Sequence, residues 1–190
     1  MHCWKVINIK REYRLPRLIL YMVIIFILVF SFSFILVGYK RPLSYDVQYF
    51  PLFVLVFLLF YPLHKLIHYY SLFSYRKSVK LKWRLEFYFI PIVHIRIKKM
   101  IPKNRYMFIL ITPFIFLNFL LLLLAFLFPY YSHYACILLG YHCSICLIDI
   151  LYFKHLVNAP KNAVIEETPK GYEILVPPTF PNTRTAISKE

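Results

Sequence analysis

The apolar residues of the chain gather into four long runs, separated by short polar or basic stretches. A helix needs about 20 apolar residues to cross the hydrocarbon core of a bilayer. The runs therefore predict four transmembrane helices, over about 18–38, 47–70, 106–128 and 134–153. The second is extended to residue 70 because no helix breaker follows Leu63. The first run is predicted to be a retained span, since Val37-Gly38 leads straight into Tyr39 without a signal-peptide cleavage site.

Between the second and third spans the pattern changes to a period of two. Apolar and charged residues alternate from Val79 to Phe87 and again from Val93 to Lys98, with Pro91 in the predicted turn region. This alternation predicts a small cytoplasmic or interfacial β-hairpin over about 79–98. Two interpretations stay open. The hairpin holds the spans in place at the membrane surface, or it offers an edge on which a peptide docks.

Composition supports a mainly α-helical membrane fold. Of the 190 residues, 61% are apolar and 20% aromatic, more than a soluble domain of this size can bury. We expect one membrane domain over 1–175, with the lipid bilayer as its main partner. From 176 to 190 the chain lacks apolar periodicity and contains Pro177, Pro178 and Pro181, so a disordered tail is predicted there. The sequence does not determine an oligomeric state.

The formal net charge of +15 is explained by topology. Lys and Arg residues cluster before the first span and between Arg76 and Arg105, and short basic loops stay in the cytoplasm. The distribution predicts that both termini and the loop between spans two and three are cytoplasmic. Nucleic-acid binding is excluded as an explanation, because the charge flanks hydrophobic spans rather than a soluble face.

Polar side chains within the predicted spans are few, and each is a candidate for function. His64 and His68 lie four residues apart, so a helix presents both imidazoles on one face, as a metal ion requires. Asp149 is the carboxylate of the last span and is expected at the same depth. His142 and Cys146 share its helix face and can add ligands or hydrogen bonds.

Lys65 leaves alternatives open at this cluster. Either His64, His68 and Asp149 hold a metal ion, or the Lys65 ammonium pairs with Asp149 in its place. A third possibility is that the histidines and Lys65 only reach toward the lipid headgroups. The nearby Cys143 and Cys146 form a C-x-x-C, which we interpret as small apolar residues packed within a helix.

At these residues the chain resembles a family of bacterial membrane proteins, the putative zincin peptidases (domain of unknown function 3267), which are distantly similar to site-2 intramembrane metalloproteases. The resemblance covers most of the chain and rests on His64-Lys65-Leu66-Ile67-His68, Thr112-Pro113-Phe114, Asp149, Pro160-Lys161-Asn162-Ala163, Glu166-Glu167 and Gly171. It implies that His64, His68 and Asp149 occupy the zinc-ligand positions. It also implies a location in the bacterial cell membrane.

Two residues depart from the family pattern. Lys65 stands at the position of the catalytic glutamate, and Ile148 stands where the family tends to have glycine before the aspartate. Asn118 is similar to a substrate-contacting asparagine of site-2 proteases, but a buried asparagine bonding between helices explains it equally well. Because an ammonium cannot accept a proton, we expect a zincin-like protein that has lost hydrolysis and binds transmembrane or membrane-proximal peptides or partners.

Two alternatives to that function remain. In one, zinc is bound and another group, His94 or Glu86 of the hairpin, serves as the base of an active metallopeptidase. In the other, the protein carries no metal and is a membrane scaffold or accessory subunit whose polar cluster holds helices together. A transporter fits less well, because one intramembrane acid and four spans offer little for a substrate pathway.

Overall fold

The computed structural model describes the chain except residues 40–45, 74–78, 87–89, 98–99, 169–170 and 178–190. For residues 10–11, 79–86 and 90–97 it describes the backbone only. The tail predicted to be disordered over 176–190 therefore lies almost wholly outside the described residues; Val176 itself ends a strand.

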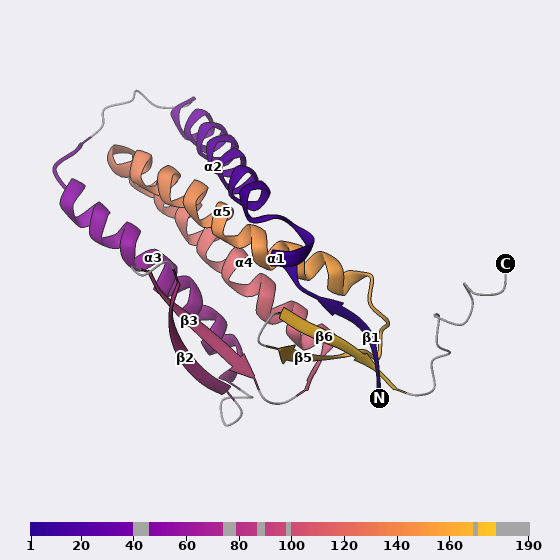
Figure 1. The fold of residues 1–190 in the computed structure, drawn as a ribbon. Coiled ribbons are helices and arrows are strands. Elements are labelled where there is room, and N and C mark those ends of the chain that lie inside the picture. The colour runs from indigo at the N-terminus through magenta and orange to yellow at the C-terminus, as the bar shows by residue number, and fades with distance from the viewer. Residues whose placement is uncertain (40–45, 74–78, 87–89, 98–99, 169–170, 178–190) are drawn as a thin grey trace.

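Four long helices form the body of the protein (Figure 1), and each is long and apolar enough to cross a membrane. They are α2 (Leu15–Gly38), α3 (Phe50–Ser71), α4 (Lys103–Leu127) and α5 (Ser132–Val157). The prediction of a mainly α fold with four spans is confirmed. Each helix differs by a few residues from its predicted range, because hydropathy locates the hydrocarbon core while helical hydrogen bonding continues into the interfacial layer.

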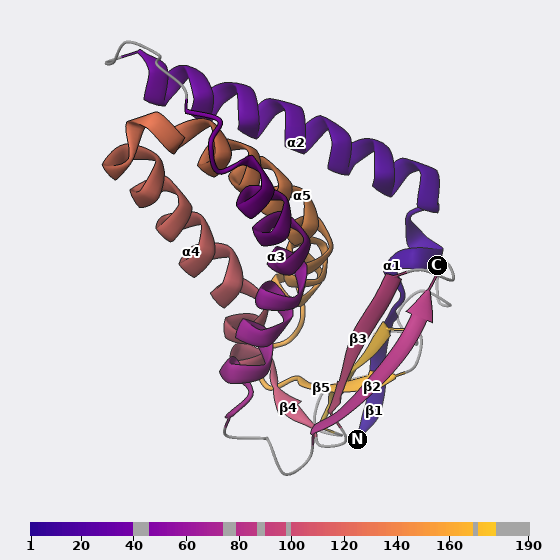
Figure 2. The ribbon, with the colours of Figure 1, turned by 90° about the vertical axis from the view of Figure 1, so that its left-hand side faces the viewer.

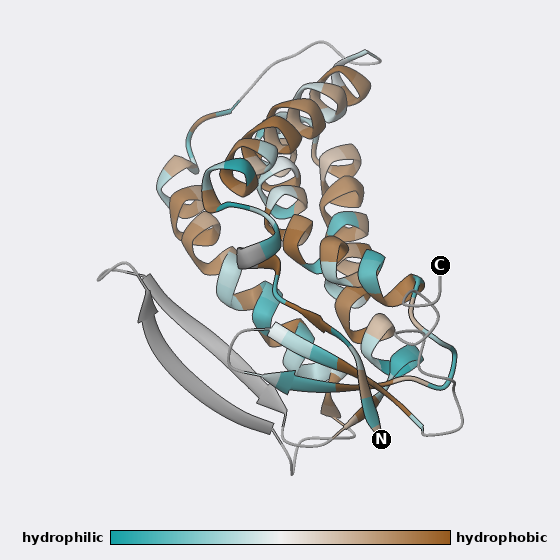
Figure 3. Cartoon of the chain, turned by 45° about the vertical axis from the view of Figure 1, so that its right-hand side comes forward, coloured by the Kyte–Doolittle hydropathy of each residue, from teal (hydrophilic) through white to brown (hydrophobic). Residues whose placement is uncertain are grey.

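The four long helices are coloured mostly as hydrophobic in Figure 3, and many of their large apolar side chains are exposed, as lipid contact requires. Phe32, Leu58 and Phe119 are each at least 66% exposed. Leaving so many large apolar side chains in water would be strongly unfavourable, at about 25 cal/mol per Å². Exposure of this kind agrees with a multi-pass membrane protein.

Close approach of α2 and α5 depends on a glycine. A Cβ atom built on Gly140 would lie 3.0 Å from the backbone oxygen of Phe26 and 3.2 Å from a carbon of its ring. Small residues allow helices to approach in a membrane, where packing replaces the hydrophobic effect as the driving force. Gly140 therefore fixes how α2 rests on the rest of the bundle.

A four-stranded antiparallel sheet lies at one end of the helices (Figure 1), and the sequence did not lead us to expect it. Its strand order is β1-β6-β5-β4, from β1 (His2–Ile7), β6 (Gly171–Val176), β5 (Val164–Thr168) and β4 (Ile101–Pro102). Helix α5 continues past the predicted end of its span, to Val157, and the next residues return as a hairpin whose Ile165, Tyr172 and Ile174 are each at most 1% exposed.

The sheet places three distant parts of the chain on one side of the bundle. The amino-terminal strand, the segment entering α4 and the segment leaving α5 are hydrogen-bonded neighbours. Because the strand before α2 and the strands after α5 lie at the same end of the bundle, the number of long helices between them is even, as the charge distribution predicted. Short helix α1 (Ile9–Glu12) connects β1 to α2 at the same end.

Two polar groups secure the contact between sheet and helices. The buried Lys103 ammonium donates to the backbone oxygens of Val157 and Ala159, which are carbonyls at the open carboxyl end of α5. The Tyr172 hydroxyl donates to the Tyr152 carbonyl at 2.9 Å, and burial raises the pKa of Tyr172, so it remains a neutral donor.

The predicted hairpin is present, with β2 (Val79–Glu86) paired antiparallel to β3 (Ile90–Ile97). Its register sets Val79 opposite Ile97 and Trp83 opposite Val93. The expectation that Pro91 lies in the turn region was wrong, because Pro91 pairs with Leu85 inside the ladder. Strand β3 approaches both α3 and β5, and Figure 2 shows the hairpin on the same side of the bundle as the four-stranded sheet.

Candidate metal centre

A cluster of polar side chains lies inside the bundle, where α3, α4 and α5 meet. His64 and His68 of α3 are 0% and 6% exposed, and His142, Cys146 and Asp149 of α5 are 0%, 0% and 8% exposed. Spacings of three and four residues bring each set onto one helix face, as the sequence predicted. With a rise of 1.5 Å per residue, His64 lies about 21 Å along α3 from Phe50 and about 10 Å from Ser71. The cluster thus lies within the length of this candidate span, nearer the sheet.

His64, His68 and Asp149 converge as three ligand atoms. His64 Nε2 lies 3.1 Å from Asp149 Oδ2 and 3.1 Å from His68 Nε2, and His68 Nε2 lies 3.4 Å from Asp149 Oδ2. Ligands about 2.0–2.1 Å from a tetrahedral zinc ion are about 3.3 Å apart. The observed separations match that value, so the sequence prediction that these three side chains meet at one depth is confirmed.

A hydrogen-bond chain fixes which nitrogen of His64 carries its proton. The Asn118 amide oxygen can only accept, so His142 donates to it from Nδ1, at 2.6 Å. A neutral His142 then accepts at Nε2, and His64 donates to it from Nδ1 at 3.1 Å. The Nε2 lone pair of His64 is therefore free to face His68 and Asp149.

A proline in α4 determines which nitrogen of His68 carries its proton. Pro113 has no N–H, so it leaves the carbonyl of Ile109, one turn earlier, without its helical donor. His68 donates to that carbonyl from Nδ1 at 3.0 Å. The second Nε2 lone pair therefore also points into the cluster.

With these tautomers, two neutral imidazole nitrogens and a carboxylate oxygen face one another as acceptors, an arrangement that a bound cation stabilises. Both imidazole protons are used elsewhere, and the Asp149 carboxylate adds a negative charge in a buried position. Burying an unpaired charge costs several kcal/mol. Two imidazole nitrogens and one carboxylate are a donor set that zinc takes in catalytic sites, and their remaining N–H groups meet partners typical of metal-bound histidines. Zinc held by such a set acts as a Lewis acid.

The Lys65 ammonium lies away from the Asp149 carboxylate. It is 5.7 Å from the centre of the Tyr61 ring, a cation–π distance. Among the described residues, the side-chain atoms next to the Asp149 carboxylate are the Nε2 atoms of His64 and His68, so the alternative of a Lys65–Asp149 pair is not what forms. His64 and His68 are buried inside the bundle, which also disagrees with groups reaching toward lipid headgroups.

The other residues noted in the sequence have different surroundings in the structure. Asn118 of α4 accepts a hydrogen bond from His142 and donates one to Cys143 Sγ at 3.4 Å, both on α5. These bonds agree with the interpretation of Asn118 as a buried asparagine that bonds between helices. Cys146 contacts both His64 and His142, so it is more than a packed apolar residue. Ile148 is 36% exposed, in contrast to the buried Asp149 beside it. For Glu86 and His94, the possible alternative bases, the side chains lie outside the described part of the structure.

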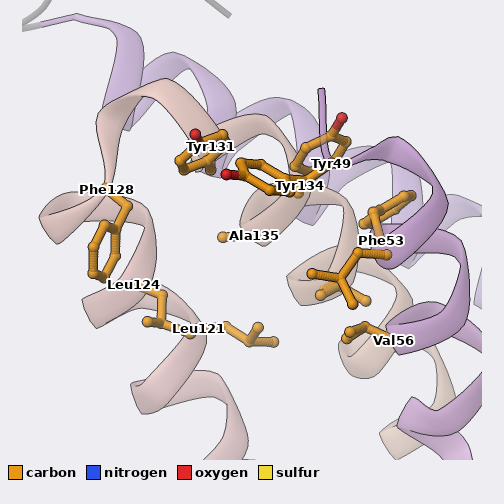
Figure 4. Close-up of a pocket in the computed structure, with 11 residues that line it drawn as sticks. Tyr49, Phe53, Val56, Leu121, Leu124, Phe128, Tyr131, Tyr134 and Ala135 are labelled. Atoms are coloured by element: carbon orange, nitrogen blue, oxygen red, sulfur yellow. The ribbon is translucent and has the colours of Figure 1, made fainter. Parts of the chain in front are cut away.

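An apolar cavity of about 350 Å³ opens at the other end of the bundle, away from the sheet. Figure 4 shows Tyr49, Tyr131 and Tyr134 at one end of it and Val56 and Leu121 at the other. A layer of buried side chains, Phe60, Leu117 and Leu139, comes next along the three helices and separates this cavity from the histidines. The cavity is therefore not part of the metal centre.

The fold has four helices long and apolar enough to span a membrane, consistent with a multi-pass membrane protein, and between them lies a buried group of two histidines and one aspartate that can hold a metal ion. The sequence model of the family described as "putative zincin peptidase" matches residues 57–164, more than half of the chain. The protein belongs to this family, and the match contains every residue of the cluster. No curated protein and no solved structure matches the chain.

Proposed function

We propose that this protein is a zinc-binding, zincin-like membrane protein that has lost peptide hydrolysis and holds transmembrane or membrane-proximal peptides or partners instead of cleaving them. The observation that carries zinc binding is the convergence of two imidazole Nε2 atoms and a carboxylate oxygen within 3.1–3.4 Å of one another. Membership of the zincin peptidase family agrees with this donor set.

The loss of hydrolysis is inferred from Lys65. In an active zincin the residue after the first histidine is a glutamate, which takes a proton from water at the metal. Lys65 holds an ammonium there, which has no lone pair and so cannot accept that proton. The distant similarity to site-2 metalloproteases belongs to the same proposal, as does a bacterial cell membrane with both termini on the cytoplasmic side.

Metal analysis of the detergent-purified protein tests zinc binding. We expect about one zinc per chain through this site, and loss of that zinc in His68→Ala and Asp149→Asn. His133→Ala is the matched control, because His133 belongs to α5 but lies at the end remote from the cluster. Native protein without zinc after growth in zinc-supplemented medium would overturn this part of the proposal.

Peptide cleavage tests the lost chemistry separately. Native protein in liposomes should leave synthetic single-span peptides intact, and Lys65→Glu should bind zinc and gain hydrolysis that a chelator abolishes. Lys65→Gln removes the charge without adding a base and serves as the control. Zinc-dependent cleavage by the native protein would establish the alternative of an active peptidase with another base.

Peptide binding is tested with the same liposomes. A single-span peptide carrying a photoreactive group should crosslink to the native protein and be displaced by the unlabelled peptide. Crosslinking no greater than that to an unrelated four-span protein would contradict the peptide-binding part and favour a scaffold.

A further inference from the structure

Cys146 and His142 bring a second group of ligand atoms against the far side of the His64 ring. His64 Nδ1 lies 3.1 Å from His142 Nε2, and Cys146 Sγ lies 3.4 Å from His142 Nε2 and 3.9 Å from His64 Nδ1. All three side chains are 0% exposed. These three atoms form a group separate from the one made by His64 Nε2, although His64 belongs to both.

The separations suit a metal ion. With zinc–nitrogen bonds of about 2.05 Å and zinc–sulfur bonds of about 2.3 Å, tetrahedral geometry sets two nitrogens about 3.3 Å apart and a nitrogen and a sulfur about 3.6 Å apart. The observed values lie on both sides of these numbers, within about 0.3 Å. His142 also donates from its other nitrogen to Asn118, the outer contact that orients a metal-bound histidine.

We propose that His64, His142 and Cys146 form a second metal site, for a thiophilic ion, zinc or copper(I), that shares the His64 ring with the site of His68 and Asp149. Two imidazoles and a thiolate bind zinc and copper(I) in preference to hard cations. The hydrogen bond between His64 and His142 occupies this position while the second site is empty.

Filling the second site releases protons in a defined number. The ion replaces the proton on His64 Nδ1 and the proton on Cys146 Sγ, so two protons leave for each ion bound while His64 bridges two metals. Metal ions on the two nitrogens of one imidazole lie about 6 Å apart. The inference rests on the proposed function in part, because His64 is shared by both sites. Cys146 belongs to the second site alone, whereas His68 and Asp149 belong to the first alone.

Metal counting with selective variants tests the proposal. Purified protein in detergent is loaded with zinc, or with copper(I) under reducing conditions, and bound metal is measured by elemental mass spectrometry. We expect two ions per native chain, one per chain in Cys146→Ser, and one per chain in Asp149→Asn. Cys136→Ser is the matched control, because Cys136 is also a buried cysteine of α5 but packs in a different cluster.

Cobalt(II) adds a spectroscopic readout that the native protein shows by itself. Cobalt bound at the second site gives a thiolate-to-cobalt charge-transfer band, which native protein should show and Cys143→Ser and Cys136→Ser should retain. The band should vanish in Cys146→Ser and in Cys146→Ala. Comparing zinc and copper(I) loading of Asp149→Asn, which keeps only the second site, decides which ion that site prefers.

The outcomes separate the two sites. One metal that is lost in Asp149→Asn and kept in Cys146→Ser, together with no charge-transfer band, overturns the second site and leaves the proposed function standing. One metal that is lost in Cys146→Ser and kept in Asp149→Asn supports the second site and overturns the first. Absence of metal and of the band in native protein overturns both.

Discussion

The imidazole Nδ1 of His68 donates to the backbone oxygen of Ile109 across 3.0 Å, joining α3 to α4 at the metal centre. That oxygen is available because residue 113, whose N–H would otherwise bond to it, is proline. A break in the hydrogen bonding of one helix thus selects the tautomer of a histidine on another. The Thr112-Pro113 step, noticed in the sequence only through a family resemblance, has a physical role here.

Pro113→Ala should weaken zinc binding. The new N–H competes with His68 for the Ile109 carbonyl, so the imidazole is held less firmly. We expect a loss of about 10-fold in affinity, the lower end of the range for outer contacts of metal ligands, because a carbonyl oxygen has a second lone pair. Competition with a chromophoric chelator in detergent measures it. Pro62→Ala is the control, since it also removes a proline inside a spanning helix but leaves Ile109 unchanged; equal losses in both variants would argue against this role.

Asn118→Leu should also reduce zinc affinity, by about 10- to 100-fold. Without the amide oxygen, His142 no longer has the acceptor that fixes its tautomer, and His64 can turn its proton toward Asp149. The same chelator competition measures the change. Thr112→Val in the same helix is the control, because the Thr112 hydroxyl donates only within its own turn, to Phe108. An unchanged affinity in Asn118→Leu would show that the chain does not orient His64.

Gly171→Ala should destabilise the four-stranded sheet. Gly171 has φ of 154°, and a Cβ there would lie 2.0 Å from the backbone oxygen of Ile7 in β1. Because that neighbour is backbone, strands β1 and β6 must separate, at a cost of about 1–3 kcal/mol or more. Thermal unfolding in detergent measures the loss. Thr168→Ala, opposite Gly171 in the register, adds no atoms and should change stability much less.

Labelling of Cys3 tests the orientation in the membrane. Cys3 is exposed on β1, whereas Cys136 and Cys146 are buried. A membrane-impermeant maleimide should label Cys3 in inside-out vesicles and leave it unlabelled in intact cells, because the basic end is predicted to face the cytoplasm. In a Cys3→Ser background, Tyr130→Cys should give the opposite result, since Tyr130 is 61% exposed at the other end of the bundle. Labelling of Cys3 from outside the cell would reverse the proposed topology.

The membrane fold was readable from the sequence because each span carries its own signal. A run of apolar residues as long as that in α2 has few alternatives to a spanning helix, and backbone groups in lipid must be satisfied within the helix. The alternation after Val79 likewise predicted a hairpin from local pattern alone. Helical spacing placed His64 with His68, and Cys146 with Asp149, on common faces.

The four-stranded sheet was not predictable in the same way. Its strands are short, and β1 pairs with β6 across nearly the whole chain, so no local pattern shows the partner. Charged residues in β5, such as Glu166 and Glu167, interrupt its apolar pattern. Burial of Tyr172 and Ile174 comes only from packing against α4, α5 and β1.

The sequence by itself determined the candidate ligands, because their spacing along a helix is a local property. Only the tertiary structure decided what those ligands do, since the proton positions depend on contacts between helices. Asn118 sets His142, His142 sets His64, and Ile109 sets His68 through bonds that span from 24 to 78 residues of sequence. No periodicity records such pairings, which arise when three helices pack and each buried polar group must find a partner.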